Sequence, residues 1–274
     1  TSRGARIERV WIEPKEEQKF YFALDSEPLL VNFDYGGALI KELRFEKPVS
    51  ELVYQLRHDE DVLGRVWALG ELKAKLQAKD VAEAEKEQII GAIGESLTKD
   101  AFWGVRRDAA AALEGVRSEA ARKALVVATR DQKSLVRARA IRALAATGDA
   151  TLAPIYQQAL NDQSYAVIDA AAEALGKTRS SEAYALLTKL LDQQSWRQRI
   201  RIAGLRGLAE LGDPRALEIG MRYAQPGNPF EVRGAAFALI GAVGKNDPRA
   251  FSFLSEQFNR ALVARNQALM IGAI

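Results

Sequence analysis

The sequence contains no cysteine and a single histidine, His58, among its 274 residues. Without thiols the chain cannot form disulfides, use a cysteine nucleophile or bind zinc through thiolates. One histidine with no second histidine at helical spacing is also a weak basis for a metal site, so the acidic residues around His58 are better explained as a solvated helix start. We therefore expect no metal site and no cofactor in this chain, and its compartment stays open.

Long hydrophobic runs are also missing. No stretch approaches the ~20 apolar residues of a membrane helix, and the N-terminal residues do not have the pattern of a signal peptide. The sequence contains no P-loop, no dinucleotide fingerprint, no His-Glu-x-x-His and no Gly-x-Ser-x-Gly. We therefore expect a soluble chain with no membrane partner, no catalytic residues and no enzymatic activity of its own.

Neither sign of charge dominates, because 39 basic and 36 acidic residues leave a net charge of only +3. Spread over the surface of a chain of this length, that charge is poor evidence for a nucleic-acid partner. Arginines do gather around residues 137–142 and 197–206, but acidic side chains interleave with them. Nucleic acid is therefore disfavoured, and a protein or peptide is the partner to expect.

What the sequence does contain first is a stretch of alternating apolar residues in positions 1–48, rich in β-branched and aromatic side chains. Turn residues at Pro14, at Pro28 and at Gly36-Gly37 divide it into four short segments. This pattern predicts a small antiparallel β segment of two hairpins. Because two hairpins bury too little surface to be stable alone, we expect the segment to be the end of a β-sandwich whose other strands precede Thr1.

Beyond Pro48 the composition changes to Ala, Leu, Arg, Glu and Lys, and the sequence repeats itself. Matched positions 106, 137, 168, 201 and 233 are 31, 31, 33 and 32 residues apart, which is the length of a two-helix repeat. The clearest copies are residues 100–113, 131–144 and 162–175. Residues 49–274 are therefore predicted to form HEAT-like repeats, a mainly α fold built as an α-helical solenoid, or α-α superhelix.

Glycine residues mark the ends of the predicted helices. The last residue of each repeated motif is followed by Gly148, Gly176, Gly212 or Gly244, where a left-handed residue commonly ends a helix. Between the motifs we predict helices at residues 81–97, 118–129, 151–160, 181–191, 214–223 and 248–262.

An aspartate and an arginine six residues apart recur in the motif: Asp59 and Arg65, Asp100 and Arg106, Asp131 and Arg137. Each aspartate is expected to cap the second helix of a repeat and to meet an arginine from the neighbouring repeat. Acid and base groups for catalysis are the alternative, but a catalytic site occurs once rather than in every repeat. We therefore interpret these six residues as a structural ladder.

A second set of residues is a candidate for contacts on the concave face, which the second helices of such arrays usually line. Aromatic residues recur near the start of the second helix, although an aromatic residue at a fixed repeat position more often packs between neighbouring helix pairs. The arginines of these second helices are the other candidates, although the alternative is that they simply form a solvent-exposed helix face. The candidates are Trp103, Arg139, Arg142, Tyr165, Trp196 and Arg199.

Four stretches of the chain resemble the C-terminal region of bacterial zinc metallopeptidases of the aminopeptidase N type. They are Phe33-Asp34-Tyr35-Gly36-Gly37 with Leu39-Ile40-Lys41, residues 56–65, residues 100–106, and residues 164–167 with 174–177. In that family a β-sandwich precedes helical repeats, while the zinc ligands and the catalytic glutamate lie in an upstream domain. The resemblance thus implies a non-catalytic scaffold region that bounds the substrate chamber or contacts the upstream domains of its own parent chain.

Three other functions remain open. A free-standing HEAT-repeat adaptor would bind a protein partner on its concave face. A nucleic-acid binder built on the arginine-bearing helices would lose affinity steeply with salt. A HEAT protein of the lyase type, which attaches a pigment to another protein, is the last alternative, and the predicted strand segment does not fit it.

Overall fold

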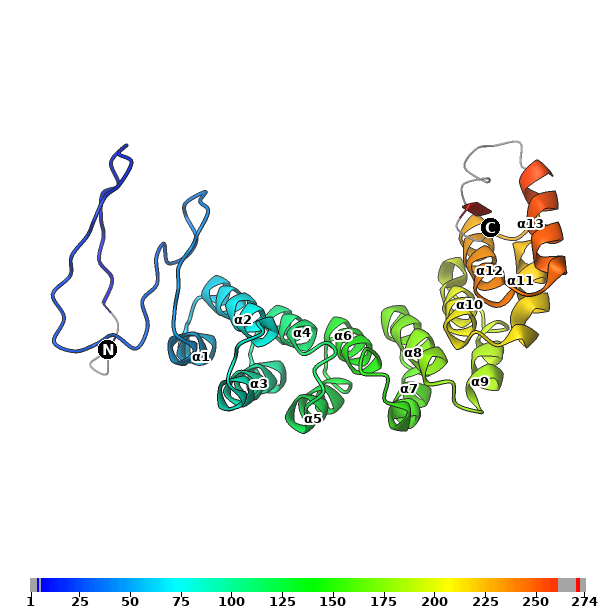
Figure 1. The fold of residues 1–274 in the computed structure, drawn as a ribbon, viewed down its shortest axis with the longest axis horizontal. Coiled ribbons are helices and arrows are strands. Elements are labelled where there is room, and N and C mark those ends of the chain that lie inside the picture. Colours follow the sequence, from blue (N-terminus) through cyan, green and yellow to red (C-terminus); the bar gives the residue numbers. More distant parts are fainter. Residues whose placement is uncertain (1–3, 5, 261–269, 272–274) are drawn as a thin grey trace.

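Residues 4, 6–260 and 270–271 are described by the structure, a computed structural model (Figure 1). Within them the regular secondary structure consists of thirteen α-helices and three short 3-10 helices. The helices form two rows along a curved array, in which the even-numbered helices lie on the inside of the bend (Figure 1). The fold is therefore the predicted mainly helical solenoid.

The inner row consists of α2 Val62–Gln77, α4 Trp103–Ala112, α6 Ser134–Ala145, α8 Tyr165–Thr178, α10 Arg199–Leu211 and α12 Phe230–Val243. The outer row consists of α1 Val49–His58, α3 Glu83–Lys99, α5 Glu119–Ala128, α7 Ala153–Ala159, α9 Ala183–Leu190, α11 Leu217–Ala224 and α13 Pro248–Arg260. The 3-10 helices Ala150–Leu152, Trp196–Gln198 and Pro214–Ala216 lead into α7, α10 and α11. Neighbouring inner helices contact each other along the whole array, from α2 to α12.

One hydrophobic core runs between the two rows. Small and branched apolar residues fill it, such as Ala109 of α4, Leu125 of α5 and Ile141 of α6, each fully buried. Alanine is frequent on the inner helices because short side chains let neighbouring helices approach closely. Each repeat therefore buries its apolar face against the next one, as expected of a solenoid.

The prediction of β-strands in residues 1–48 is wrong for the part of the segment that the structure describes, residues 4 and 6–48, which contains no strand. This segment is extended and leads away from the helices in two loops (Figure 1). Its apolar side chains, among them Trp11, Tyr21 and Ile40, are mostly exposed. Alternating sequence alone does not make a sheet, because isolated hairpins gain too little from burial and pairing to persist.

A buried lysine attaches the segment to the first helix. The Nζ of Lys47 donates to the carbonyl oxygen of Val31 at 2.5 Å and to Oε1 of Gln55 at 2.8 Å, and it lies 3.2 Å from the Glu51 carboxylate. Burial lowers the pKa of Lys47, although the Glu51 carboxylate partly offsets this. Asn32 adds a hydrogen bond to Asp59 at 2.7 Å. Residues 31–47 are thus held to α1 by polar contacts rather than by a sheet.

The predicted helix boundaries are close to the observed ones, and α13 is described as far as Arg260, so the predicted end at Leu262 lies outside the described residues. The glycine prediction is only partly right. Gly212 ends α10 in the left-handed region with a φ of 69°, whereas Gly148 has the same φ but lies two residues beyond Ala146, the C-cap of α6. Gly176 instead lies inside α8, which ends at the left-handed Arg179, and Gly244 has a φ of −93°.

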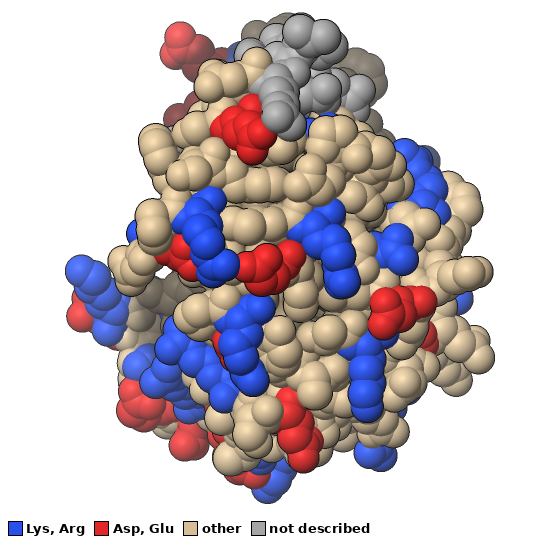
Figure 2. All heavy atoms as spheres, turned by 90° about the vertical axis from the view of Figure 1, so that its right-hand side faces the viewer, with Lys and Arg blue, Asp and Glu red and all other residues tan. Residues whose placement is uncertain are grey.

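Charged side chains of both signs alternate on the C-terminal end of the array (Figure 2). Many of them are paired locally. Arg249 lies between Asp247 at 2.7 Å and Glu218 at 2.6 Å, and Arg215 lies 2.6 Å from Asp213. This face therefore presents no continuous surface of one sign.

Candidate binding surface on the inner row

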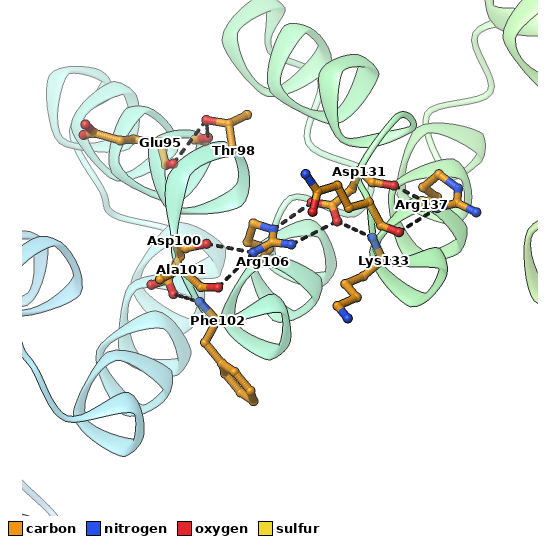
Figure 3. A network of polar contacts seen from close by, with 11 residues as sticks. Glu95, Thr98, Asp100, Ala101, Phe102, Arg106, Asp131, Lys133 and Arg137 are labelled. Atoms are coloured by element: carbon orange, nitrogen blue, oxygen red, sulfur yellow. Dashed lines mark hydrogen bonds and ion pairs between the residues drawn. The ribbon is translucent and has the colours of Figure 1, made fainter.

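The ladder residues lie at the N-terminal ends of the inner helices, where they join neighbouring repeats (Figure 3). Arg106 donates from Nε and Nη2 to the carboxylate of Asp131 at 2.7 and 3.0 Å, and from Nη1 to the carbonyl oxygen of Asp100 at 2.8 Å. Arg65 contacts Asp100 and Arg137 contacts Asp162 in the same way. The structure thus pairs Asp100 and Asp131 with arginines of the preceding repeats, and adds Asp162 as the last acceptor. Asp59 gives Arg65 only its carbonyl oxygen, while its carboxylate accepts from Asn32 and Gln55.

The aspartates hold a turn rather than cap the helix directly. Asp100 accepts from the backbone N of Phe102 at 2.8 Å, and Asp131 accepts from that of Lys133 at 2.7 Å. Phe102 and Lys133 are themselves the residues that precede α4 and α6. In the first repeat Asp61, not Asp59, bonds to the first turn of α2. Each rung therefore fixes both the entry into a helix and the neighbouring repeat.

Ion pairing dominates the electrostatics of the ladder. Burial alone would raise the pKa of Asp131, but the hydrogen bonds from Arg106 and from the backbone of Lys133 hold that pKa below its usual value. The pKa of Asp162 is lowered by its bond to Arg137 in the same way, against the effect of burial. The rungs are therefore charged and satisfied at neutral pH, which favours a structural role over proton transfer.

The ladder stops at α8, because Ile168 occupies the position of the arginine. In the next two repeats the arginines bind backbone instead: Arg201 donates to the carbonyl oxygen of Leu191 at 2.8 Å, and Arg233 to that of Ala224 at 3.1 Å. In the C-terminal half of the array the arginine therefore binds a carbonyl oxygen at the end of the preceding outer helix. In the N-terminal half it pairs with an aspartate.

A charged cluster lies across the middle of the inner row, on α6, α8 and α10. Asp169 of α8 is mostly buried between Arg206, at 3.0 Å, and Arg142, at 3.5 Å. Glu173 lies one helical turn further along α8. Burial raises its pKa, and the neighbouring Asp169 adds to the effect, while Arg142 and Arg206 oppose it. We call Arg142, Asp169, Glu173 and Arg206 the inner charged cluster.

The six candidate contact residues differ in what they do. Arg142 belongs to the inner charged cluster, and Arg139 pairs with Glu114 at 2.6 Å. Trp103 is half-buried against the core, beside Phe102 and Arg107. The three others remain at the surface, namely Tyr165, Trp196 and Arg199. The backbone N of Trp196 donates to the Tyr165 hydroxyl at 3.3 Å, so the structure brings these two aromatic residues together.

Exposed apolar side chains form a row at the same helix ends, and sequence reasoning named two of them, Tyr165 and Trp196, but missed the rest. Leu63, Phe102, Leu135, Tyr165 and Trp196 are between 37% and 66% exposed, and each lies at or just before the start of an inner helix. We call these five residues the apolar edge. A signal was present, because an apolar residue lies within a few positions of the repeated aspartate in four of these repeats, where capping alone would favour polar residues.

The junction between residues 32–47 and the first two helices forms a hollow of about 280 Å³. Phe33, Phe45, Leu63 and Trp67 contribute to its lining. The Nζ of Lys47 lies 5.1 Å from the Trp67 ring and is already satisfied by its polar partners. The hollow therefore has an apolar wall and no free nucleophile with a base beside it.

Among the residues that the structure describes, no group of three or more metal-binding side chains occurs. Nor is any helix in the described part of the chain both long and apolar enough to cross a membrane.

Comparisons with known proteins agree with this architecture. A sequence profile of HEAT repeats matches residues 90–155 and 127–203. The complex of CpcE and CpcF of phycocyanin lyase from Nostoc sp. PCC7120 has a similar structure, with 20% identity, a TM-score of 0.55, and 86% of this chain and 98% of that chain covered. YibA of E. coli is also similar, with 15% identity, a TM-score of 0.51, and coverage of 81% and 90%.

No protein with curated information matches the chain. At such low identity the structural likenesses show the fold alone. Together with the repeat profile, they identify the array as a mainly helical solenoid with HEAT repeats over residues 90–203.

Proposed function

We propose that this chain is a non-catalytic scaffold that binds a protein or peptide segment along its inner row. The observation that carries the proposal is the placement of the inner charged cluster. Arg142, Asp169 and Arg206 come from three successive inner helices, and the two arginine side chains remain 39% and 45% exposed. Charged groups spread over several repeats suit a ligand that extends along the array, as solenoids bind extended partners.

The Glu173 carboxylate adds a second feature to this surface. Glu173 carries a raised pKa and makes no ion pair among the described residues. A half-buried carboxylate beside another carboxylate is held at a cost, and such groups gather at functional surfaces more often than elsewhere. A bound segment with a basic group near Glu173 and an acidic group near Arg142 or Arg206 would complete these pairs.

The test uses a displayed library of random peptides, selected on the whole chain. We expect recovered peptides to bind the double variant Arg142→Glu, Arg206→Glu at least roughly ten-fold more weakly, a loss of about 1.4 kcal/mol. The matched control reverses two exposed outer-row charges, Lys123→Glu and Lys189→Glu, and should bind normally. Circular dichroism checks that both variants fold. A library that yields no binder, or binders that do not discriminate between the two variants, would contradict the proposal.

A second candidate function rests on residues 4–48. We propose that the chain is the accessory region of a zinc aminopeptidase-like protein, in which this segment contacts the upstream domains of the parent chain. Most exposed large apolar side chains among the described residues lie on this segment, and Lys47 fixes its base to α1. Exposed apolar surface of this extent marks an interaction site in most proteins.

The coding sequence upstream of Thr1 tests the second candidate. A His-Glu-x-x-His motif followed by a downstream glutamate would support a metallopeptidase parent. A start codon directly before Thr1 would exclude it and leave the free-standing adaptor. The pigment-lyase alternative is no longer opposed by predicted strands, but the likeness to a phycocyanin lyase shows only the fold, so no function is drawn from it.

A further inference from the structure

Four members of the apolar edge, from α4 to α10, carry this inference, because the fifth, Leu63 of α2, follows the acidic Glu60 and Asp61. The ladder joins the start of α4 to the turn before α6 through Arg106 and Asp131, and the start of α6 to the turn before α8 through Arg137 and Asp162. The hydrogen bond from Trp196 to the Tyr165 hydroxyl joins α8 to the turn before α10. Phe102, Leu135, Tyr165 and Trp196 therefore lie on neighbouring helix ends along one side of the array.

Beside these four members, the charged residues at the helix starts that make no ion pair among the described residues are positive. The exposed starts of the helices are residues 101–103, 132–135, 163–166 and 196–199, and their only charged residues are Lys133, Arg197 and Arg199. Lys133 and Arg199 make no side-chain ion pair in the part of the chain that the structure describes. Figure 3 shows that the side chains of Phe102 and Lys133 both point away from the ladder, to the same side. The aspartates nearby are occupied by the ladder arginines.

The exposed Trp196 is followed by a strained stretch of backbone. The two residues that follow it, Arg197 and Gln198, have φ values of 50° and 58°, which residues other than glycine rarely adopt. Each such residue costs roughly 1–3 kcal/mol and tends to occur at functional sites. Here the two left-handed residues lead into α10, while 66% of the Trp196 side chain is left in solvent.

The spacing of the edge identifies a conformation for its ligand. Packed helices lie about 8–10 Å apart, so the starts of neighbouring inner helices recur at roughly that interval along the array. A polyproline-II segment advances about 9 Å in each turn of three residues. An extended ligand of this kind would place an apolar side chain at every third position opposite a new repeat. Aromatic surfaces already recognise such segments in other binding modules.

We propose that the apolar edge binds an extended, polyproline-II-like segment of a partner protein, with an apolar residue at every third position and acidic residues between them. This rests on the proposed scaffold function and specifies its ligand. The apolar side chains pack on Phe102, Leu135, Tyr165 and Trp196. The carboxylates contact Lys133 and Arg199.

Synthetic peptides of known spacing test the inference. The probe is a labelled peptide of Leu-Glu-Pro repeats, one repeat for each of Phe102, Leu135, Tyr165 and Trp196, whose binding is measured by fluorescence anisotropy. One comparison peptide has the same composition but places leucine at irregular intervals, and another replaces every glutamate by lysine. We expect the regular acidic peptide to bind at least roughly ten-fold more tightly than either.

Variants of the protein locate the binding. The double variant Tyr165→Ala, Trp196→Ala removes two edge members and should weaken binding of the regular peptide roughly ten-fold or more. Phe251→Ala, which truncates an exposed apolar side chain on the outer helix α13, is the control and should leave binding unchanged. Lys133→Glu with Arg199→Glu should weaken the acidic peptide and strengthen the lysine peptide.

Two results would overturn the inference: equal binding of regular and irregular peptides, or binding of the regular peptide that the edge variants do not change. If the regular peptide fails to bind while library peptides still respond to Arg142→Glu with Arg206→Glu, the edge inference fails and the scaffold function stands. If neither class binds, both fail.

Discussion

The two halves of the array hold their repeats together by different means. From α2 to α8, charged rungs such as Arg106 with Asp131 join each repeat to the next. Between α8 and α10 no rung joins the helix starts; here the helix backbones touch, and Arg206 pairs with Asp169 further along the helices. A Cβ on Gly176 would lie 2.3 Å from the carbonyl oxygen of Gly207, and one on Gly207 would lie 2.7 Å from that of Ala172.

One repeated motif therefore serves two kinds of interface between repeats. The rungs link the starts of neighbouring inner helices through side chains, whereas glycine lets the backbones of α8 and α10 touch. The change occurs at Ile168, beside the inner charged cluster and one repeat before the strained turn at Arg197. The middle of the array is therefore where the geometry of the inner row changes.

The largest expected effect comes from breaking the glycine contact. Gly176→Ala places a methyl group against the backbone of α10, and the helices must separate, so we expect a loss of about 3 kcal/mol in the free energy of unfolding. Gly91→Ala in α3 is the matched control, because a Cβ there would meet nothing within 4 Å. The control should gain roughly 0.5–1 kcal/mol from helix propensity. Urea denaturation measures both, and a stable Gly176→Ala protein would contradict the close contact.

The next effect compares the stability that an arginine gives when it pairs with an aspartate and when it binds a backbone carbonyl oxygen. Arg106→Leu leaves the Asp131 carboxylate, only 11% exposed, without its partner, and should cost about 2 kcal/mol. Arg201→Leu removes bonds to a carbonyl oxygen and to Gln198, and should cost only about 1 kcal/mol. Equal losses in the two variants, measured by urea denaturation, would show that the ladder gives no extra stability.

The pH dependence of Arg106→Leu follows from the pKa of Asp131. A carboxyl group whose pKa is lowered in the folded state contributes stability above its unfolded value, near 3.8, and loses it as pH falls through the folded value. The difference between wild type and variant should therefore be full at neutral pH and shrink below about pH 4. Thermal melts across this range provide the measurement. A difference that stays constant down to strongly acidic pH would exclude the ion pair as its cause.

A smaller effect is expected in the outer row. The hydroxyl of Tyr156 is buried and has no hydrogen-bond partner among the described residues, and burial raises its pKa. Tyr156→Phe should therefore stabilise the chain by about 1 kcal/mol. The matched control Tyr184→Phe removes a bond from the hydroxyl to the carbonyl oxygen of Arg215 and should be neutral or slightly destabilising. A destabilised Tyr156→Phe protein would show that the hydroxyl is satisfied.

The smallest effect concerns the inner charged cluster. Glu173→Gln removes a carboxylate whose pKa is raised, first by burial and then by Asp169. Its penalty exists only above its unfolded pKa, near 4.5, and grows as pH rises through the folded value. The variant should be more stable than wild type at neutral pH, by less than about 1 kcal/mol, and equal to it in acid. A stabilisation that persists in acid would point to a cause other than charge.

The repeat period and helix positions could be predicted from the sequence because helical periodicity and spacing are local signals. The ladder was also readable, since Asp and Arg recurred at one spacing. The second half shows the limit of this reasoning. Gly176 occupies the place of a helix-ending glycine in the repeat, but the close approach of α10 requires it inside α8, and no local pattern reveals a distant contact.

The N-terminal segment could not be predicted for a related reason. Its alternation indicates strands, yet a strand is stable only when another strand or a core covers it. In the structure Lys47, rather than a sheet, fixes the segment, through partners that lie up to sixteen residues away in sequence. Leu63, Phe102 and Leu135 of the apolar edge were missed because each looks like an ordinary exposed residue until the repeats are placed side by side.

Hydrogen–deuterium exchange with a library-selected peptide tests the central claim of binding on the inner row most directly. The account predicts slower exchange in the inner helices α4, α6, α8 and α10, strongest at their first turns beside Phe102, Leu135, Tyr165 and Trp196. The outer helices α3, α5, α7 and α9 should exchange as they do without peptide. Protection confined to the outer row, or to residues 6–48, would contradict the account.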